Sequence, residues 1–269
     1  MKVLQEKTHG ETQVQIPAEV TSAYPLPPYM FQDARMYTAS IRVDPRDLEG
    51  ILPQDLYPLP GFEDVVTVGF NKFAAPESNI RPYNELTIGM PATLRTSARE
   101  VSGHYVIQMF LGSSTPESAV SPIMAGHHLL GMPKREAEFT VDGDFDHAVA
   151  IKVMRHGVVV VDVDVDKRGA PAEPSALARM VEEVAFVLKA IPKADGSGWD
   201  VLQLAGQPLE TADDYHVHDC RGANITFADN RITLDTGRVL HIKEVLSATF
   251  THMDFMLGWR GTVHDYLAK

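Results

Sequence analysis

A lysine near the middle of the chain follows a short apolar segment and could act as an amine nucleophile. Lys134 comes directly after residues 129–133, which are Leu, Leu, Gly, Met and Pro, and Arg135 follows it. An amine attacks a carbonyl only when it is deprotonated, whereas a free lysine has a pKa of about 10.4 and is cationic at neutral pH. Burial among apolar groups and a neighbouring cation both lower such a pKa. The apolar segment would supply the first condition and Arg135 the second, although the same spacing also suits an exposed pair after a proline turn.

The segment that contains this lysine also matches a known motif. Gly126-His127-His128-Leu129-Leu130-Gly131-Met132-Pro133-Lys134-Arg135 resembles the Gly-Arg-Glu-x-x-Gly-Tyr-Pro-Lys-Lys motif of the acetoacetate decarboxylase family. Further matches occur in the same order along most of the chain: Tyr24-Pro25 through Pro28-Tyr29-x-Phe31, Tyr83-x-Glu85, Leu188-Lys189-x-Ile191-Pro192 with Asp195-Gly196-Ser197, and His264-Asp265-Tyr266-Leu267. Their order and spacing make a chance match an unsatisfactory explanation.

The resemblance implies a role for several of these residues. Lys134 matches the family's Schiff-base lysine, and Arg135 matches the second basic position, which would tune the pKa of that lysine. Glu85 matches an active-site glutamate that could move a proton to or from the carbon beside an iminium. The site is also expected to bind substrate through a set of five residues: Arg35, Tyr83, Met109, His128 and Met132.

Three departures from the family pattern leave the substrate open. A second glutamate of the family would align near Phe70 or Asn71, neither of which ionises, and Arg35 lies one position from the family's substrate-orienting arginine. His127 and His128 replace an Arg-Glu pair, and their role stays open. The resemblance therefore implies a Schiff-base lyase that acts on a small keto acid without a cofactor. An aldolase or dehydratase on pyruvate-type acids, or a ligand-binding member without catalysis, are the alternatives.

The pattern of apolar residues predicts a mainly β (α+β) fold. Alternating or short apolar runs predict strands at 35–43, 65–73, 92–101, 104–111, 139–141, 149–153, 158–166, 199–204, 223–227 and 245–257, with a hairpin turn at Ser102-Gly103. A short helix is expected at 46–52 and one long helix at 175–190, which Pro192 would end. We expect a single domain over residues 1–269, an antiparallel β-barrel-like sheet decorated by one principal helix, as in the acetoacetate decarboxylase fold.

Composition limits the partners of the protein. Its 36 acidic and 24 basic residues give a formal charge of −12, which disfavours nucleic acid and anionic membranes as partners. One cysteine, Cys220, excludes an intrachain disulfide, and no apolar run approaches the length of a membrane span. We expect a cytoplasmic homo-oligomer.

Two groups of residues resemble metal ligands, but neither predicts a metal site. Asp142, Asp144 and Asp146 imitate part of a calcium loop that lacks its glycine and its final glutamate. His216 and His218 would share one face of a strand near Asp219 and Cys220, without a third ligand at recognisable spacing. We therefore expect no metal, and the role of this histidine pair stays open.

Overall fold

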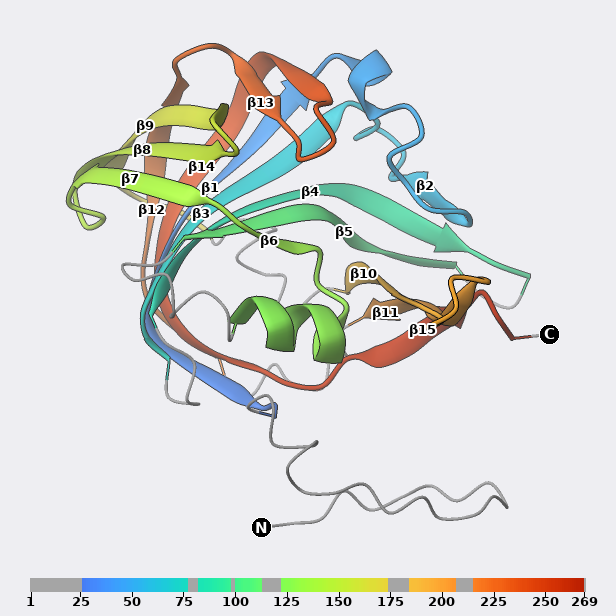
Figure 1. Cartoon of the computed structure of the whole chain (residues 1–269). Helices are drawn as coiled ribbons and strands as arrows, with labels where there is room; N and C mark the ends of the chain where they lie inside the picture. Colours follow the sequence, from blue (N-terminus) through green and yellow to red (C-terminus); the bar gives the residue numbers. More distant parts are fainter. Residues whose placement is uncertain are drawn as a thin grey trace.

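A computed structural model describes residues 26–76, 82–97, 100–112, 122–173, 184–206 and 215–268. In this part of the chain fifteen strands form one mixed sheet, which curves around a short helical segment (Figure 1). The elements are β1 (Tyr29–Val43), η1 (Pro45–Leu48), β2 (Leu56–Pro58), β3 (Val65–Pro76), β4 (Tyr83–Arg95), β5 (Glu100–Gly112), η2 (Gly126–Leu130), β6 (Lys134–Glu136), β7 (Glu138–Gly143), β8 (Ala148–Arg155), β9 (Val158–Pro171), β10 (Ala185–Pro192), β11 (Trp199–Gly206), β12 (Tyr215–Phe227), β13 (Arg231–Thr233), β14 (Val239–Leu257) and β15 (Gly261–Asp265).

The order of the strands brings both ends of the chain into one sheet. The path runs β15-β11-β10-β5-β4-β3-β1-β14-β12-β9-β8-β7, and β2, β6 and β13 pair with β4, β5 and β14 at its sides. Most neighbours are antiparallel, whereas β6 and β10 run parallel to β5. The mainly β architecture that the sequence predicts is therefore confirmed. No helix among the described residues is long and apolar enough to cross a membrane.

The central strands bury side chains on both faces of the sheet. On one face Phe70, Leu86 and Phe110 lie opposite one another on β3, β4 and β5 and belong to a large core. On the other face lies a second core, here called the helix-side core, which packs against the segment around η2. It contains Tyr29, Phe31, Ala34, Met36, Phe73, Tyr83, Val106, Met109, Leu111, Ala125, Leu130, Met132, Val187, Ala205, Met253 and Phe255.

One predicted turn is wrong. β4 continues to Arg95 and β5 begins at Glu100, so Ser102 and Gly103 lie within β5, opposite Thr93 and Ala92. Packing explains the glycine, because a Cβ atom on Gly103 would lie 2.1 Å from the carbonyl oxygen of Val184. The glycine thus permits a close backbone approach and does not mark the hairpin turn.

The long helix predicted at 175–190 is also wrong where the structure describes it. Residues 185–190 lie in β10, which joins β5 to β11, while residues 174–183 fall outside the described residues. Pairing of Leu188 with Leu204 and of Ala185 with His104 outweighs the helical spacing of the apolar residues. The helical segment of the described chain lies elsewhere, at 122–125 and η2, and the helix predicted at 46–52 is the shorter η1, capped by Asp44.

Candidate active site

Strand register places the candidate residues on the helix-side face. Asn71 pairs with Glu85, Glu85 with Leu111, and Lys134 with Met109, so these side chains project from neighbouring strands toward the same core. The residues lie far apart in the sequence but within four adjacent strands, β3, β4, β5 and β6. The sheet therefore brings the predicted lysine and glutamate together.

Lys134 and Glu85 form a buried pair. Lys134 Nζ lies 3.2 Å from Glu85 Oε2, and the two side chains are only 5% and 4% exposed. Lys134 Nζ also lies 5.2 Å from the centre of the Tyr83 ring, whose face attracts a cation. Apart from these contacts and two polar neighbours of Glu85, Thr87 and Asn71, the surroundings are the apolar side chains of the helix-side core. The amine and the carboxyl group are thus held in the interior of the protein.

The pair places an amine and a carboxyl group side by side next to a small cavity. A carboxyl group in this position can give a proton to a bound molecule or take one from it. A neutral amine is the form that attacks a carbonyl carbon. The geometry can therefore supply a nucleophile and an acid at the same place.

Neutral side chains bind the second oxygen of Glu85. The Thr87 hydroxyl donates to Glu85 Oε1 at 3.0 Å, and Asn71 Nδ2 lies 3.4 Å from the same oxygen and 3.5 Å from Thr87 Oγ1. Both residues are buried. Sequence reasoning noted position 71 without giving it a role and missed Thr87. No strand was predicted at 85–87, where β4 lies. With a strand there, the two-residue spacing would have placed Glu85 and Thr87 on one face.

Tyr83 contributes a neutral phenol beside the lysine. Burial raises its pKa well above the ordinary value, and the nearby charges of Glu85 and Tyr29 add to the effect. The phenol therefore stays protonated across the physiological pH range. It can offer a ring face to a cationic amine or iminium, as well as a hydroxyl donor.

The turn before Lys134 is fixed by backbone contacts. η2 ends at Gly131, which adopts the left-handed conformation at φ 73° and bonds back to the Gly126 carbonyl. Lys189 Nζ caps this end of the segment by donating to the Leu129 carbonyl at 3.1 Å. The Pro133 carbonyl then accepts from Met109 at 3.1 Å and starts the pairing of β6 with β5. Lys134 is thus held at a rigid start of a strand.

Gly126 provides space for the lysine side chain. A Cβ atom at this position would lie 2.7 Å from Lys134 Cδ and 3.0 Å from Lys134 Cε, so any side chain would have to displace the lysine. Gly126 is buried in η2 beneath the stem of Lys134. The glycine of the sequence motif therefore has a steric reason in this chain.

We expect Gly126→Ala to lower activity by roughly tenfold or more, because a misplaced reacting group costs about that much or greater. Stability should change little, since alanine favours a helical backbone by about 1 kcal/mol over glycine. Gly169→Ala is the matched control, because a Cβ atom on Gly169 would meet no other atom within 4 Å. Activity is measured with the keto acid that gives the most product with the unchanged protein. Full activity in Gly126→Ala would contradict this steric role.

A narrow cavity lies beside the lysine. Tyr29, Phe31, Tyr83, Pro122, Ala125, Gly126, Leu130, Met132, Lys134 and Leu257 line it. Its volume of about 10 Å³ is roughly the space of one water molecule. An organic ligand is larger than this volume, so side chains that line the cavity would have to move before such a ligand could reach the lysine. Flexible residues such as Met132 and Leu130 are suited to such movement.

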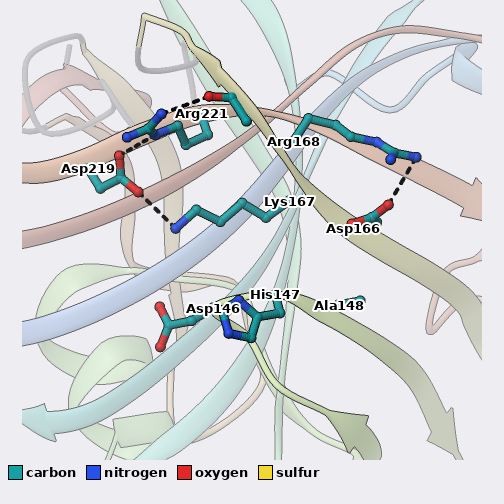
Figure 2. A pocket seen from close by; sticks show the side chains of 9 residues that line it. Asp146, His147, Ala148, Asp166, Lys167, Arg168, Asp219 and Arg221 are labelled. Atoms are coloured by element: carbon teal, nitrogen blue, oxygen red, sulfur yellow. Dashed lines mark hydrogen bonds and ion pairs between the residues drawn. The ribbon is translucent and has the colours of Figure 1, made fainter.

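A wider hollow elsewhere has a different chemistry. It has a volume of about 380 Å³ and lies between the turn that joins β7 to β8 and strands β9 and β12 (Figure 2). Its charged residues are already paired: Lys167 and Arg221 with Asp219, Arg168 with Asp166, and Asp146 with Arg35 outside the hollow. The lysine cavity, although far smaller, is the one that holds a buried amine beside a carboxylate.

Tyr83, Met109 and Met132 lie with Lys134 in the helix-side core, whereas Arg35 does not. Met36 pairs with Asn71 and faces this core, so the preceding residue, Arg35, faces the opposite side of the sheet. There Arg35 forms ion pairs with Asp33 at 2.7 Å and Asp146 at 2.8 Å. Its guanidinium group is therefore already bound by two carboxylates.

Arg135 points away from the amine, and His128 is exposed at the surface. Arg135 pairs with Phe110, a residue of the other face, and its side chain lies 3.3 Å from Asp235. His128 is exposed on η2, with its ring 5.6 Å from that of His127. Burial lowers the pKa of His127, and Arg135 and His128 add to this effect. The tuning role of Arg135 and the substrate contact of His128 stay predictions.

One histidine of β12, His218, and one of β14, His252, lie beside carboxylates. His216 and His218 do share a face, with ring centres 4.6 Å apart. His218 Nε2 lies 2.9 Å from Asp254, and His252 Nε2 lies 2.8 Å from Asp33. Among the described residues no group of three or more potential ligands is arranged to hold a metal ion.

Comparison with known proteins identifies the family. The sequence model of the family "Acetoacetate decarboxylase (ADC)" matches residues 13–267. Acetoacetate decarboxylase 2 of Mesorhizobium japonicum is 30% identical over 252 residues, which cover 92% of this chain and 87% of that protein. Acetoacetate decarboxylase 1 of the same organism is 29% identical and covers 93% of this chain and 94% of its own length.

Solved structures share the fold at lower identity. The crystal structure of acetoacetate decarboxylase from Legionella pneumophila superposes with a TM-score of 0.73 at 22% identity and covers 98% of this chain and 95% of its own. The enduracididine biosynthesis enzyme MppR, complexed with pyruvate, has a TM-score of 0.68 at 18% identity and covers 93% and 95%. With a family match over almost the whole sequence, the chain belongs to the acetoacetate decarboxylase family.

Proposed function

We propose that the protein is a Schiff-base-forming lyase that acts on a small keto acid, with Lys134 as the nucleophile and Glu85 as the acid and base. The observation that carries this proposal is the buried pair of Lys134 Nζ and Glu85 Oε2, 3.2 Å apart in an apolar core. Burying a charged pair usually lowers the stability of a protein. A lysine without a chemical role would therefore gain no stability from this position. Membership of a decarboxylase family supports the same chemistry.

The proposed reaction uses only Lys134, Glu85, substrate and water. The neutral amine adds to the keto carbonyl, and loss of water gives an iminium ion. The iminium draws electrons from the neighbouring carbon, so a carbon–carbon bond to that carbon can break. For a keto acid that decarboxylates, the electron pair of the broken bond moves toward the iminium nitrogen and carbon dioxide leaves. The product of this step is an enamine, whose carbon then takes a proton that Glu85 has drawn from water. Hydrolysis of the resulting iminium returns the free amine.

Aldol or dehydratase chemistry on a pyruvate-type acid is the second candidate. Glu85 is the only carboxylate among the described residues that contacts Lys134, and its neighbour on β3 is the neutral Asn71. The guanidinium group of Arg35 lies on the other face, bound to Asp33 and Asp146. Neither Asn71 nor Arg35 therefore offers a charge that would turn a departing carboxylate out of the imine plane. The fold neighbour MppR, complexed with pyruvate, makes pyruvate the natural alternative to test.

We therefore expect weak decarboxylation of acetoacetate, with a kcat/KM at least ~10²-fold below the ~10⁴ M⁻¹s⁻¹ of an ordinary enzyme. The reason is that neither Asn71 nor Arg35 would orient the carboxylate of a bound substrate. The measurement is carbon dioxide release from acetoacetate, beside product formation from pyruvate with an aldehyde. Carbon dioxide release at an ordinary enzymatic rate would contradict this expectation and identify an acetoacetate decarboxylase.

Trapping with borohydride tests the proposal itself. The protein is incubated with acetoacetate and, separately, with pyruvate, and is then reduced with borohydride. The mass of the intact protein is measured by mass spectrometry. A mass increase that corresponds to the reduced imine is the expected result, because only an iminium is captured irreversibly. A protein that is trapped but turns over neither substrate would be a ligand-binding member of the family. Absence of any adduct would reject Schiff-base chemistry.

A further inference from the structure

The two oxygens of the Glu85 carboxylate have different surroundings. Oε1 accepts a hydrogen bond from the Thr87 hydroxyl at 3.0 Å and lies 3.4 Å from Asn71 Nδ2. Oε2 lies 3.2 Å from Lys134 Nζ and receives no hydrogen bond of regular geometry in the described part of the chain. One oxygen is thus held by neutral donors, and the other faces the amine.

We propose that Thr87 and Asn71 are positioning residues that occupy Oε1 and make Oε2 the oxygen that exchanges protons with substrate. The inference rests on the proposed Schiff-base function. In the step concerned, the enamine electron pair forms a new C–H bond with the proton of Glu85 Oε2. The nitrogen becomes an iminium, and Glu85 is left as a carboxylate. An oxygen that already accepts two donors cannot easily carry that proton, so the proton resides on Oε2.

The hydrogen bonds have a fixed direction. Thr87 has one hydroxyl proton, and a carboxylate oxygen can only accept it, so Thr87 Oγ1 in turn accepts from Asn71 Nδ2 at 3.5 Å. The order Asn71 to Thr87 to Glu85 polarises each donor toward the carboxylate. Thr87 makes the shortest contact of the three. We therefore expect its hydroxyl to have the larger effect and Asn71 to support it.

A merely structural role explains Asn71 poorly. The side chain is 4% exposed, and its Oδ1 has no hydrogen-bond partner among the described residues. Burying an acceptor without a donor is destabilising, and an apolar side chain of the same size would avoid that loss. The amide therefore contributes through Nδ2, the atom that lies beside Glu85 and Thr87.

Exchange of the methyl hydrogens of pyruvate in deuterated water tests the inference. An enzyme-bound imine of pyruvate loses and regains these hydrogens through Glu85, and proton NMR records their loss. Thr87→Val keeps the shape of the side chain and removes the donor. We expect borohydride trapping of pyruvate to stay at the wild-type level in Thr87→Val while methyl exchange falls roughly tenfold, part of the 10²-fold or more that a positioned acid contributes. Asn71→Leu should slow exchange by a smaller factor, and Thr87→Ser should restore it.

Thr93→Val is the matched control. Thr93 lies on the same strand, is 1% exposed, and bonds to Ser102 at 3.0 Å, away from the lysine. It should keep both trapping and exchange. Wild-type exchange in Thr87→Val, or an equal loss of trapping and exchange, would overturn the positioning role alone. If the wild-type protein traps neither pyruvate nor acetoacetate, the proposed function is rejected, and this inference is rejected with it.

Discussion

Lys134→Ala is expected to remove the borohydride-trapped adduct completely and to lower turnover by roughly 10³-fold or more, the scale seen when a covalent nucleophile is lost. In the proposed reaction the amine at this position is the group that bonds to substrate, and its loss leaves no nucleophile there. The measurement is the intact mass after reduction with a keto acid, beside the rate of product formation. The same mass increase in the alanine variant would show that another amine reacts.

Stability must be separated from chemistry in this experiment. Removing Lys134 leaves Glu85 buried without its partner, and a buried charge that loses its partner costs about 3–5 kcal/mol. Lys134→Arg is therefore a necessary companion, because it keeps a cation beside Glu85 but cannot form an imine. Both variants should lose the adduct, whereas only the alanine variant should unfold more easily.

Arg135→Ala is the matched control on the neighbouring residue. Arg135 lies on the other face of β6 and pairs with Asp235, which Arg155 also contacts. We expect this variant to keep the adduct. The tuning role that the family resemblance implies for Arg135 predicts that the pH optimum of activity rises in the variant, since loss of a nearby cation lets an amine hold its proton longer. An unchanged pH profile would leave the tuning to burial alone.

Glu85→Gln is expected to keep imine formation and to slow the following proton transfer by roughly 10²-fold or more. Glutamine has almost the same shape, and Thr87 can still donate to its oxygen. Its amide nitrogen, however, cannot give a proton to an enamine carbon or take one from it. The variant should therefore accumulate the intermediate while product forms slowly.

Trapped mass and turnover have to be measured on the same protein. A normal amount of adduct with slow turnover would place Glu85 in the proton transfer. Equal losses of adduct and turnover would mean that Glu85 only maintains the structure around the lysine. The melting temperature of Glu85→Gln shows whether the variant keeps the stability of the unchanged protein.

Local sequence patterns predicted the strands better than the connections between them. In β9 the alternation of Val161, Val163 and Val165 with aspartates was confirmed, since all three valines are buried. The turn at Ser102-Gly103 failed because a glycine that permits close packing looks like a turn residue. The predicted helix failed at 185–190, the part that the structure describes, because a strand buried by distant partners can show helical spacing of its apolar residues.

The candidate site shows the same limit at the level of single side chains. Resemblance to a family identified Lys134 and Glu85, which the fold brings within 3.2 Å of each other. Arg35 and Arg135 each lie one residue away from a position that faces the helix-side core. Because adjacent residues of a strand face opposite sides, that single step sends both guanidinium groups elsewhere. The sequence cannot show which face is which until the strands are paired.

Strand pairing also implies an order of assembly during folding. β3, β4 and β5 are neighbours both in sequence and in the sheet, and β6 joins β5, so the strands that carry Asn71, Glu85 and Lys134 can associate over far shorter connections than β1 and β14 can. β1 pairs with β14 across most of the chain, for example Phe31 with Phe255, and that closure carries a larger entropic cost. A chain in which β14 has not yet paired would hold the lysine beside the glutamate but leave Leu257 absent from the cavity wall. The enclosed cavity would therefore be complete only when β1 and β14, from opposite ends of the polypeptide, have paired.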